Sequence, residues 1–449
     1  MGKTRSHSKK GKSDEIDRII CGLEQRVDGS ILEELVQGAK KKSGRPAKAK
    51  AIELLKGLVW HALSEVGTLG AHFAAVTGKR LAESSLSERR SNIAWEVFSQ
   101  ILSLFLRPLA HEKKHPEAFY QGYRLVGVDG TEFSLRNTSR ILQHCSKGVS
   151  RRVKAAFAKV RVCVLVELAI HNPIAAAVGS RQESEAVLSA LLLYQLPEHS
   201  LLLADRYYGN AQVVSQFMRE CPESRFLFRV NKRNKSSCIK KLEDGSRLVE
   251  VAVRDQEHPS RIKGHVKLRE IRATLRRKGF QATSVRLWTN FLSAKQAPAT
   301  ELVELYARRW EHETYYREVK LSLGDGNLLA SQGVETACQE IAALLIASSI
   351  VAEHRIKAAK SGLKVTDISF AHTLFNVRCL WEVMPLLSTL LTAKQLNSLA
   401  DKLREKLRPD KLPKKRFRSC PRAVRQPIKG WPRLLKNSYS FGQPQFTIV

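Results

Sequence analysis

One segment of the chain carries tyrosine, arginine, glutamate and lysine at regular intervals. Tyr306 and Glu313 are seven residues apart, and Glu313 and Lys320 are another seven apart. Seven residues of an α-helix, at about 100° each, return almost to the same side, so a regular helix would place all three on one face. Arg309 and Arg317 lie four residues before and after Glu313 and would flank it there. A carboxylate buried among cations is unusual in a core, but it suits a place where a metal ion meets a phosphate backbone.

Two aspartates elsewhere could complete a metal site with Glu313. Asp129 lies in the apolar stretch Val-Gly-Val-Asp-Gly-Thr, and Asp205 ends the stretch Leu-Leu-Leu-Ala-Asp. A carboxylate in an apolar strand is costly to bury unless it is paired or binds a metal. Three carboxylates with open water positions are typical of Mg²⁺, often as a two-metal site. These residues indicate metal-dependent phosphoryl transfer; alternatively, each aspartate is an ordinary turn or cap residue.

The composition favours a polyanionic partner. The 449 residues include 76 Lys and Arg against 43 Asp and Glu, a formal net charge of +33. Such an excess makes DNA or RNA the first partner to consider. The alternative is a ribosome-associated or generally adhesive basic protein. The length allows two or more folded units with a sizeable core.

The cysteines and the chain start indicate a soluble protein of a reducing compartment. None of the eight cysteines forms a Cys-x-x-Cys pair, and Cys163 lies in an apolar run typical of a core strand. The first residues are basic but are followed by no apolar run of a signal peptide. The longest apolar stretch, residues 341–352, is shorter than a membrane span. We therefore expect an intracellular location.

The N-terminal part divides into a basic arm and a helical region. We expect residues 1–48 to form a basic disordered arm; within it, Gly44-Arg45-Pro46 resembles the core of a minor-groove hook, although a solvated linker fits equally well. Residues 49–118 carry apolar positions at helical spacing and form the expected DNA-binding domain. Residues 71–80 and 84–92 fit a helix-turn-helix, with an ordinary three-helix cap as the alternative.

The central part changes to strand periodicity and predicts a mixed α/β domain over residues 119–372. Strands are expected at 124–134, 160–169, 174–178, 200–205 and 225–230, with helices at 184–193 and 209–219. Residues 231–284 are polar and strand-leaning and predict a β-rich insertion. A strand at 285–292 and one long helix at 299–323 follow it. Residues 373–449 form a helical and basic C-terminal region, in which five prolines between residues 409 and 432 exclude a long helix there.

These motifs together resemble a known family. The pattern Tyr-x2-Arg-x3-Glu-x6-Lys, met by Tyr306, Arg309, Glu313 and Lys320, resembles the signature of DDE transposases of the insertion-sequence-four family. Trp310 in Tyr-x-x-Arg-Trp-x-x-Glu, Asp129-Gly-Thr and Ala-Asp205-Arg-x-Tyr fit as well. So does a β-rich insertion between the second aspartate and the glutamate. The resemblance covers about residues 120–355.

The resemblance implies an RNase H-like core, with Asp129, Asp205 and Glu313 binding two Mg²⁺, for which Mn²⁺ could substitute. It implies strand cleavage and transfer at the terminal inverted repeats of an element, by a homodimer bound to double-stranded DNA in the bacterial cytoplasm and nucleoid. Tyr306, Arg309 and Lys320 would hold phosphates beside the scissile bond, together with Arg317. Alternatives are a catalytically retired DNA-binding descendant and another RNase H-like nuclease.

Two residues depart from the family pattern or could not be placed in it. His312 stands where an aliphatic residue is common, and we expect its side chain to point away from the metal site. Some relatives use a tryptophan of the insertion to stack on a flipped base. Trp288 lies near that region, and we expect it to be a core residue.

Overall fold

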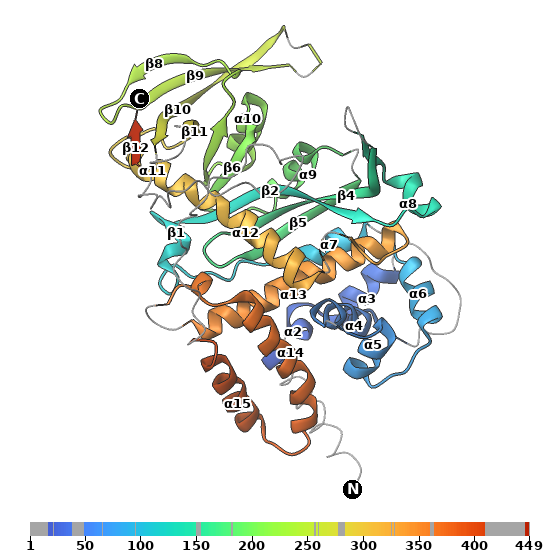
Figure 1. The fold of residues 1–449 in the computed structure, drawn as a ribbon. Coiled ribbons are helices and arrows are strands. Elements are labelled where there is room, and N and C mark those ends of the chain that lie inside the picture. Colours follow the sequence, from blue (N-terminus) through green and yellow to red (C-terminus); the bar gives the residue numbers. More distant parts are fainter. Residues whose placement is uncertain are drawn as a thin grey trace, which may run out of the picture. The chain divides into compact units, whose positions relative to one another are not determined.

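The computed structural model describes residues 17–20, 22–37, 49–64, 66–94, 96–149, 154–180, 183–255, 257–258, 260–276, 283–324, 326, 328–359, 363–408 and 445–448. The chain folds as two compact units, drawn in Figure 1. The first comprises Met1–Pro197 and Trp310–Lys411, and the second comprises Glu198–Arg309 and Leu412–Val449. Residues 1–16 and 38–48 of the predicted arm, which include Gly44-Arg45-Pro46, lie outside the described residues, as do residues 409–444 of the proline-rich basic tail.

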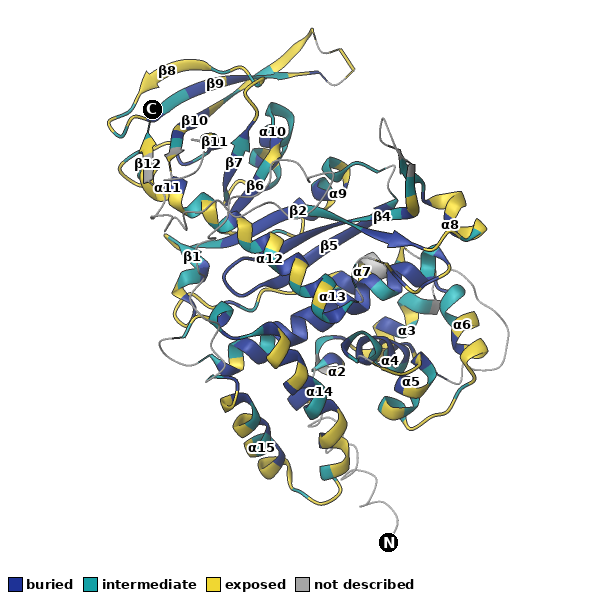
Figure 2. Ribbon diagram, in the orientation of Figure 1, coloured by how far each residue is buried: buried dark blue, intermediate teal, exposed yellow. Residues whose placement is uncertain are grey.

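Three long antiparallel strands form the sheet of the first unit. They are β2 (Tyr123–Leu135), β4 (Lys154–Glu167) and β5 (Asn172–Ser180), with short β1 (Phe119–Tyr120) on β2 and β3 (Lys147–Val149) on β4. β4 lies between β2 and β5 and places Asp129 opposite Val164. β5 is buried almost throughout (Figure 2), because three helices pack on it, α7 (Val97–Phe105), α9 (Glu185–Leu193) and α13 (Val334–Ala358). The three predicted strands are confirmed, and Cys163 lies buried in β4 as expected.

Helices from both ends of the chain share the core of the first unit. The N-terminal ones are α2 (Leu23–Arg26), α3 (Gly29–Gln37), α4 (Ala51–Leu63), α5 (Leu69–Thr77), α6 (Glu83–Ser91) and α7 (Val97–Phe105). The expectation of a disordered arm up to residue 48 is wrong for α2 and α3, because Leu23 and Leu32 are fully buried. α5 ends at Gly78, whose φ of 71° suits glycine, and α6 follows after a turn. Contact of α5 and α6 with DNA stays a prediction.

The long helix α13 (Val334–Ala358) is the centre of this core (Figure 2). It packs against α4, α7, α14 (Phe370–Leu387) and α15 (Ala393–Glu405). Trp60 of α4 stacks on Trp381 of α14 at 5.1 Å between ring centroids. By length and composition α13 is the one helix among the described residues that could cross a membrane, but 78% of its apolar window is buried inside the protein. Its apolar character is therefore explained by packing.

The second unit is built on one mixed sheet. Its members are β6 (Ser200–Gly209), β7 (Arg225–Val230), β8 (Ser237–Lys241), β9 (Arg247–Arg254), β10 (Ile262–Arg276), β11 (Thr283–Thr289) and β12 (Gln445–Ile448). They run in the order β6-β7-β11-β10-β9-β8, with β12 on β10. The predicted insertion, β8 to β10, thus extends the same sheet through β11. β6 and β7 are parallel and joined by α10 (Ala211–Glu220).

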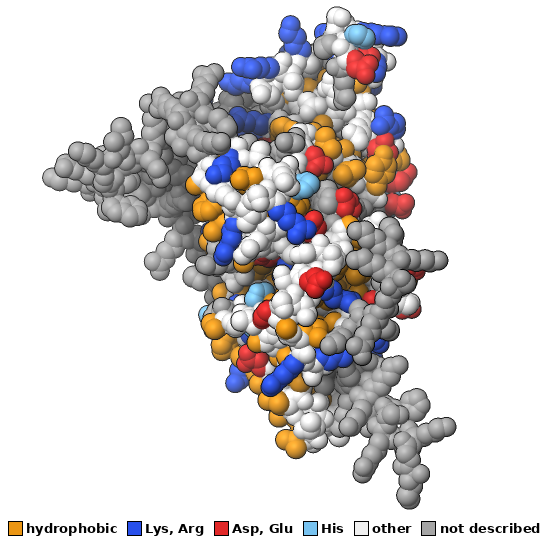
Figure 3. Space-filling view, turned by 90° about the vertical axis from the view of Figure 1, so that its right-hand side faces the viewer, with side chains coloured by type: hydrophobic (Ala, Val, Ile, Leu, Met, Phe, Trp, Pro, Cys, Tyr) orange, Lys and Arg blue, Asp and Glu red, His pale blue; other side chains and the backbone are white. Residues whose placement is uncertain are grey.

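The remaining elements complete the predicted order of three strands, helix, strand, helix and strand. α8 (Ser139–His144) and α9 (Glu185–Leu193) belong to the first unit, with the short helical turns η1 (Pro116–Ala118) and η4 (Val365–Asp367). The mixed α/β fold with the predicted order of elements is therefore confirmed. Figure 3 shows Lys and Arg side chains distributed over one face among acidic and apolar groups, so the charge excess forms no single band on that face.

Candidate active site

The helical segment of the signature is not one regular α-helix. It consists of α11 (Ala299–Tyr306), a 3-10 turn η2 (Ala307–Arg309), α12 (Trp310–Glu318) and a π-helical turn η3 (Val319–Leu323). A 3-10 turn has about three residues per turn and a π turn more than four, so neither keeps the 100° step on which the single stripe depended. The regular winding on which the predicted single face for Tyr306, Glu313 and Lys320 depended is therefore interrupted on both sides of α12, and the common face stays a prediction. Tyr306 and Arg309 belong to the second unit, and Glu313, Arg317 and Lys320 to the first.

Within the first unit, α12 and η3 lie along β2. His312 Nε2 donates to the Val164 carbonyl at 3.1 Å, and the Tyr316 hydroxyl donates to the Asp129 carbonyl at 2.6 Å. Lys320 Nζ donates to the Glu132 carbonyl at 3.0 Å. Glu313 precedes Tyr316 by three residues, which places the two on neighbouring positions of the helix surface. The fold therefore carries Glu313 on the turn that contacts Asp129.

A further carboxylate, Glu185, lies beside Asp129. The Gly130 amide donates to Asp129 Oδ1 at 2.9 Å and to Glu185 Oε1 at 3.1 Å. A Cβ on Gly130 would lie 2.6 Å from Glu185 Cδ, so glycine allows this close approach. The sequence analysis missed Glu185, because it stands in the first turn of α9, where an acidic residue is common at any helix start.

Within the second unit, Asp205 lies where the β6–β7 ladder is interrupted. Pairing runs from Leu201 to Ala204 and resumes only at Gly209. Asp205 Oδ1 accepts the Tyr207 amide at 2.7 Å. Burial raises the pKa of Tyr306 to about 12. The charges of Arg309 and Arg229 lower this pKa, and the charge of Asp205 raises it further.

The sequence analysis also missed Arg229. Arg309 is itself buried and donates a hydrogen bond to Tyr306. The second unit therefore gathers two predicted site residues, Tyr306 and Arg309, near Asp205, with Arg229 alongside.

Two glutamates of α12, Glu313 and Glu318, have different surroundings. Glu313 is exposed, as is Arg317, so the expectation of a buried carboxylate is wrong. Glu318 instead faces the core: its carboxylate lies 2.8 Å from His171 Nδ1 and 3.4 Å from Arg355 Nη1. Burial raises the Glu318 pKa, but His171 and Arg355 outweigh it and leave that pKa below its usual value. Glu318 is thus a structural ion-pair residue, whereas Glu313 lies on the exposed side of α12.

His312 and Trp288 both lie in the interior of the protein. His312 is fully buried against β4 and points away from the exposed side of α12, as expected. Trp288 is fully buried in β11, and its Nε1 donates to Glu270 Oε2 at 3.0 Å, so the expected core position is confirmed.

The donors near Asp129 fit a divalent cation. Asp129 and Glu185 share one amide, so their negative oxygens converge, and hard oxygen ligands of this kind suit Mg²⁺. Among the described residues, no group of three or more His, Cys, Asp or Glu side chains is gathered as a complete metal site. The set Asp129, Asp205 and Glu313 stays a prediction.

Tyr316→Phe tests the contact between α12 and β2. The change removes the hydroxyl that donates to the Asp129 carbonyl and leaves the ring in its buried place. We expect the free energy of unfolding to fall by about 1 kcal/mol, because the carbonyl loses a donor. Urea unfolding measures this. Tyr207→Phe is the control, since Tyr207 is exposed; equal stability of Tyr316→Phe and wild type would contradict the role.

The chain is similar to known transposases. Residues 120–350 match the family model described as the transposase DDE domain. The chain is 25% identical over 365 residues to transposase InsG for insertion sequence element IS4 of Escherichia coli strain K12, covering 80% of each chain. A piggyBac transposase synaptic complex with hairpin DNA, studied by cryo-electron microscopy, is similar with a TM-score of 0.42 and 10% identity, over 87% of this chain and 84% of that one.

The family match spans more than half of the chain and includes Asp129, Asp205 and Glu313. The chain therefore belongs to the DDE transposase family. It is a DNA transposase, of the kind found in IS4 elements. The predicted family and function are confirmed.

Proposed function

We propose that the chain cuts and joins DNA strands at the terminal inverted repeats of its element, with Asp129, Asp205 and Glu313 as the catalytic carboxylates. The observation that carries the proposal is the path of α12 along β2, which presents Glu313 on the turn that contacts Asp129. Asp205 comes from the second unit, where it lies near Tyr306. All three are negatively charged oxygen donors, as Mg²⁺ requires.

When bound, Mg²⁺ would activate the attacking oxygen and stabilise the leaving oxygen of the phosphodiester. The residues of the chain would bind and orient the DNA. Lys320 lies near Lys159, and burial together with that second ammonium lowers the Lys320 pKa. Two adjacent cations favour an anion between them, which supports phosphate binding by Lys320. Tyr306, Arg309 and the exposed Arg317 would hold further phosphates of the element end.

Lys320→Ala tests the phosphate contact. A hydrogen bond to a charged group contributes about 1.5–3 kcal/mol, so cleavage should slow by about 10- to 150-fold. The measurement is the single-turnover rate on DNA carrying the element ends. Lys394→Ala on α15 removes an exposed lysine elsewhere and should leave the rate unchanged. Unchanged binding and cleavage by Lys320→Ala would remove this residue from the site.

A homodimer bound to two element ends is proposed as the active form, because each element has two ends to be cut and joined. The proposal as a whole is tested by incubating the purified chain with Mg²⁺ and a plasmid carrying the element ends. Nicked or excised product is expected. Binding of the ends without any cleavage would instead favour a retired DNA-binding descendant.

A further inference from the structure

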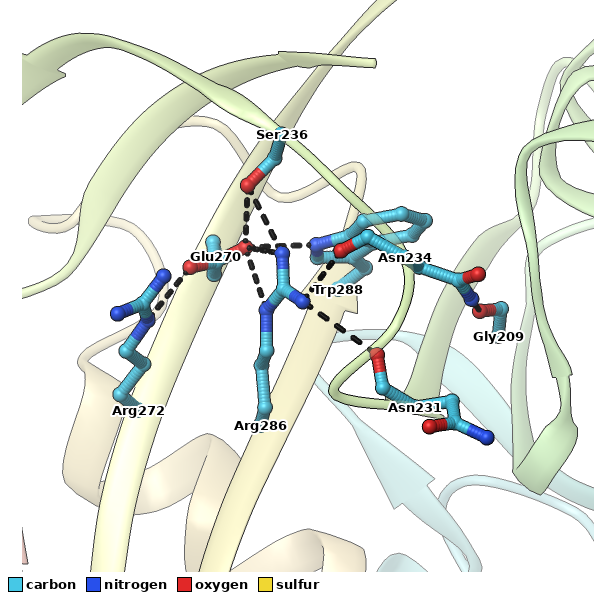
Figure 4. Close-up of polar contacts among 8 residues, drawn as sticks. All are labelled: Gly209, Asn231, Asn234, Ser236, Glu270, Arg272, Arg286 and Trp288. Atoms are coloured by element: carbon cyan, nitrogen blue, oxygen red, sulfur yellow. Dashed lines mark hydrogen bonds and ion pairs between the residues drawn. The ribbon is translucent and has the colours of Figure 1, made fainter. Parts of the chain in front are cut away.

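The second unit contains a buried polar cluster that the catalytic proposal does not use (Figure 4). At its centre is Glu270 of β10, which is 1% exposed. Its carboxylate accepts hydrogen bonds from Trp288 Nε1, Ser236 Oγ and Arg286 Nε at 2.8–3.0 Å. Arg272 Nε donates to its other oxygen at 2.7 Å. Burial raises the Glu270 pKa, but the bonds from Arg286 and Trp288 outweigh it and hold that pKa at about 2.

Arg286 connects this cluster to the loop before β8. Its Nη1 donates to the Asn234 carbonyl at 2.6 Å and to the Asn231 carbonyl at 3.4 Å, and its Nη2 donates to Ser236 Oγ at 2.8 Å. The Asn234 side chain donates in turn to the Gly209 carbonyl. Figure 4 shows these groups converging on Arg286. The loop backbone is thereby held at both ends by one guanidinium, whose side chain is 14% exposed.

Gly209 ties the loop to the strand that carries Asp205. A Cβ at this position would lie 2.0 Å from the Arg229 carbonyl oxygen, so only glycine permits the end of β6 to lie this close to β7. Asn234 is bonded to that same residue. The loop therefore has a fixed relation to β6 within the second unit.

The fixed loop presents cations to solvent. Lys232, Arg233 and Lys235 are exposed, and within the described part of the chain no carboxylate pairs with them. Arg272 is 46% exposed, although its Nε is held by Glu270. Figure 4 shows Arg272 and Arg286 on either side of Glu270, with Ser236 close to the carboxylate. Arg272 thus keeps its terminal nitrogens for a further acceptor.

This arrangement differs from an ordinary run of solvated charges. Mobile lysines and arginines lose conformational entropy on binding, and a backbone that is already fixed reduces this loss. An arginine oriented through Nε presents its two terminal nitrogens as a fork, which matches two oxygens of one phosphate. Arg272 and Arg286 contact Glu270, and three further cations stand in the loop, namely Lys232, Arg233 and Lys235. The local excess of positive charge favours an anionic polymer.

We propose that Arg272 and the loop of residues 232–235 form a second phosphate-binding site, which binds the DNA backbone next to the phosphates held by Tyr306 and Arg309. This inference rests on the proposed function, because the ligand is the DNA to be cut. This second site would not take part in catalysis; it would fix the register of the duplex on the insertion. Glu270 and Arg286 are positioning residues, because they hold Arg272 and the loop in place.

The test is the salt dependence of DNA binding, measured by fluorescence anisotropy with a labelled random-sequence duplex and no divalent metal. The variant is Lys232→Gln with Arg233→Gln and Lys235→Gln. Each lost phosphate contact lowers the slope of log affinity against log salt by about 0.9, so the slope should fall by about 2 to 3. The matched control, Lys394→Gln with Lys402→Gln and Lys406→Gln on α15, removes the same charge and should keep the wild-type slope.

A wild-type slope in the loop variant would overturn the inference and leave the proposed function standing. Absence of DNA binding by the wild-type chain itself would contradict both. Arg272→Gln should lower the slope by about 1, and an unchanged slope would remove Arg272 from the site. All these positions are exposed, so the variants should have melting temperatures close to that of the wild type.

A final variant distinguishes the effect of the fixed loop backbone from the effect of the positive charges. Arg286→Lys keeps the charge but loses the fork that holds Asn231, Asn234 and Ser236. We expect weaker binding than wild type although every loop cation is present. Wild-type affinity in Arg286→Lys would show that the loop needs no fixed backbone and would overturn the positioning role.

Discussion

Glu313→Gln should slow DNA strand cleavage by about 10³-fold or more, because a neutral amide is a poor ligand for Mg²⁺ and metal stabilisation of the transition state amounts to several kcal/mol. Glu313 is exposed, so the free energy of unfolding should change by less than about 0.5 kcal/mol. Single-turnover cleavage and urea unfolding measure the two effects separately.

The matched control for this prediction is Glu311→Gln, two residues earlier on the same helix. It removes the same charge from α12 and should cut at close to the wild-type rate. Equal rates for wild type and Glu313→Gln would exclude Glu313 as a metal ligand. A loss of stability in Glu313→Gln would show that its role is structural.

Glu318→Ala, unlike Glu313→Gln, should act on stability and lower the free energy of unfolding by about 3–5 kcal/mol. The substitution leaves Arg355 fully buried without its carboxylate, and two of its nitrogens already lack a hydrogen-bond partner among the described residues. Urea unfolding of Glu318→Ala against Glu311→Ala is the measurement. A difference below about 1 kcal/mol would contradict the buried ion-pair role.

The stabilisation by Glu318 should also depend on pH. Its pKa is lowered in the folded state, so the contribution is complete above the usual carboxyl value of 4.5 and is lost as the pH falls through the lower, folded value. The stability gap between wild type and Glu318→Gln should therefore narrow in acid. Together, the two glutamates would separate metal binding from packing on one helix.

The strands that carry the two aspartates were predictable because their apolar runs are long. β2 and β6 begin within one residue of the predicted positions. The helices α2 and α3 were not predicted, because they are short and lie between two basic runs, although four of the nine residues of α3 are apolar. Leu23 and Leu32 are fully buried where α2 and α3 pack against α7 and α3 also packs against α4, so tertiary packing stabilises both helices.

The sequence proposed residue types for the site, but it could not predict their geometry. The spacing of Tyr306, Glu313 and Lys320 assumed regular helical winding, and the 3-10 and π turns at 307–309 and 319–323 interrupt it. Glu185 was missed because an acidic residue is common in the first turn of a helix, and only the fold brings it to Gly130 from 55 residues away. Spacing along the chain reveals neither the irregular turns nor the approach of Glu185.

The most direct test of the central claim is whether Asp205, from the second unit, acts with Glu313 in one site. Single-turnover cleavage in Mg²⁺ should be compared for Asp205→Asn, Glu313→Gln and the double variant. Residues that act as a unit are strongly non-additive, so the account predicts that each single change costs about 10³-fold and that the double variant is hardly slower than either. Cleavage by Asp205→Asn at close to the wild-type rate would contradict it.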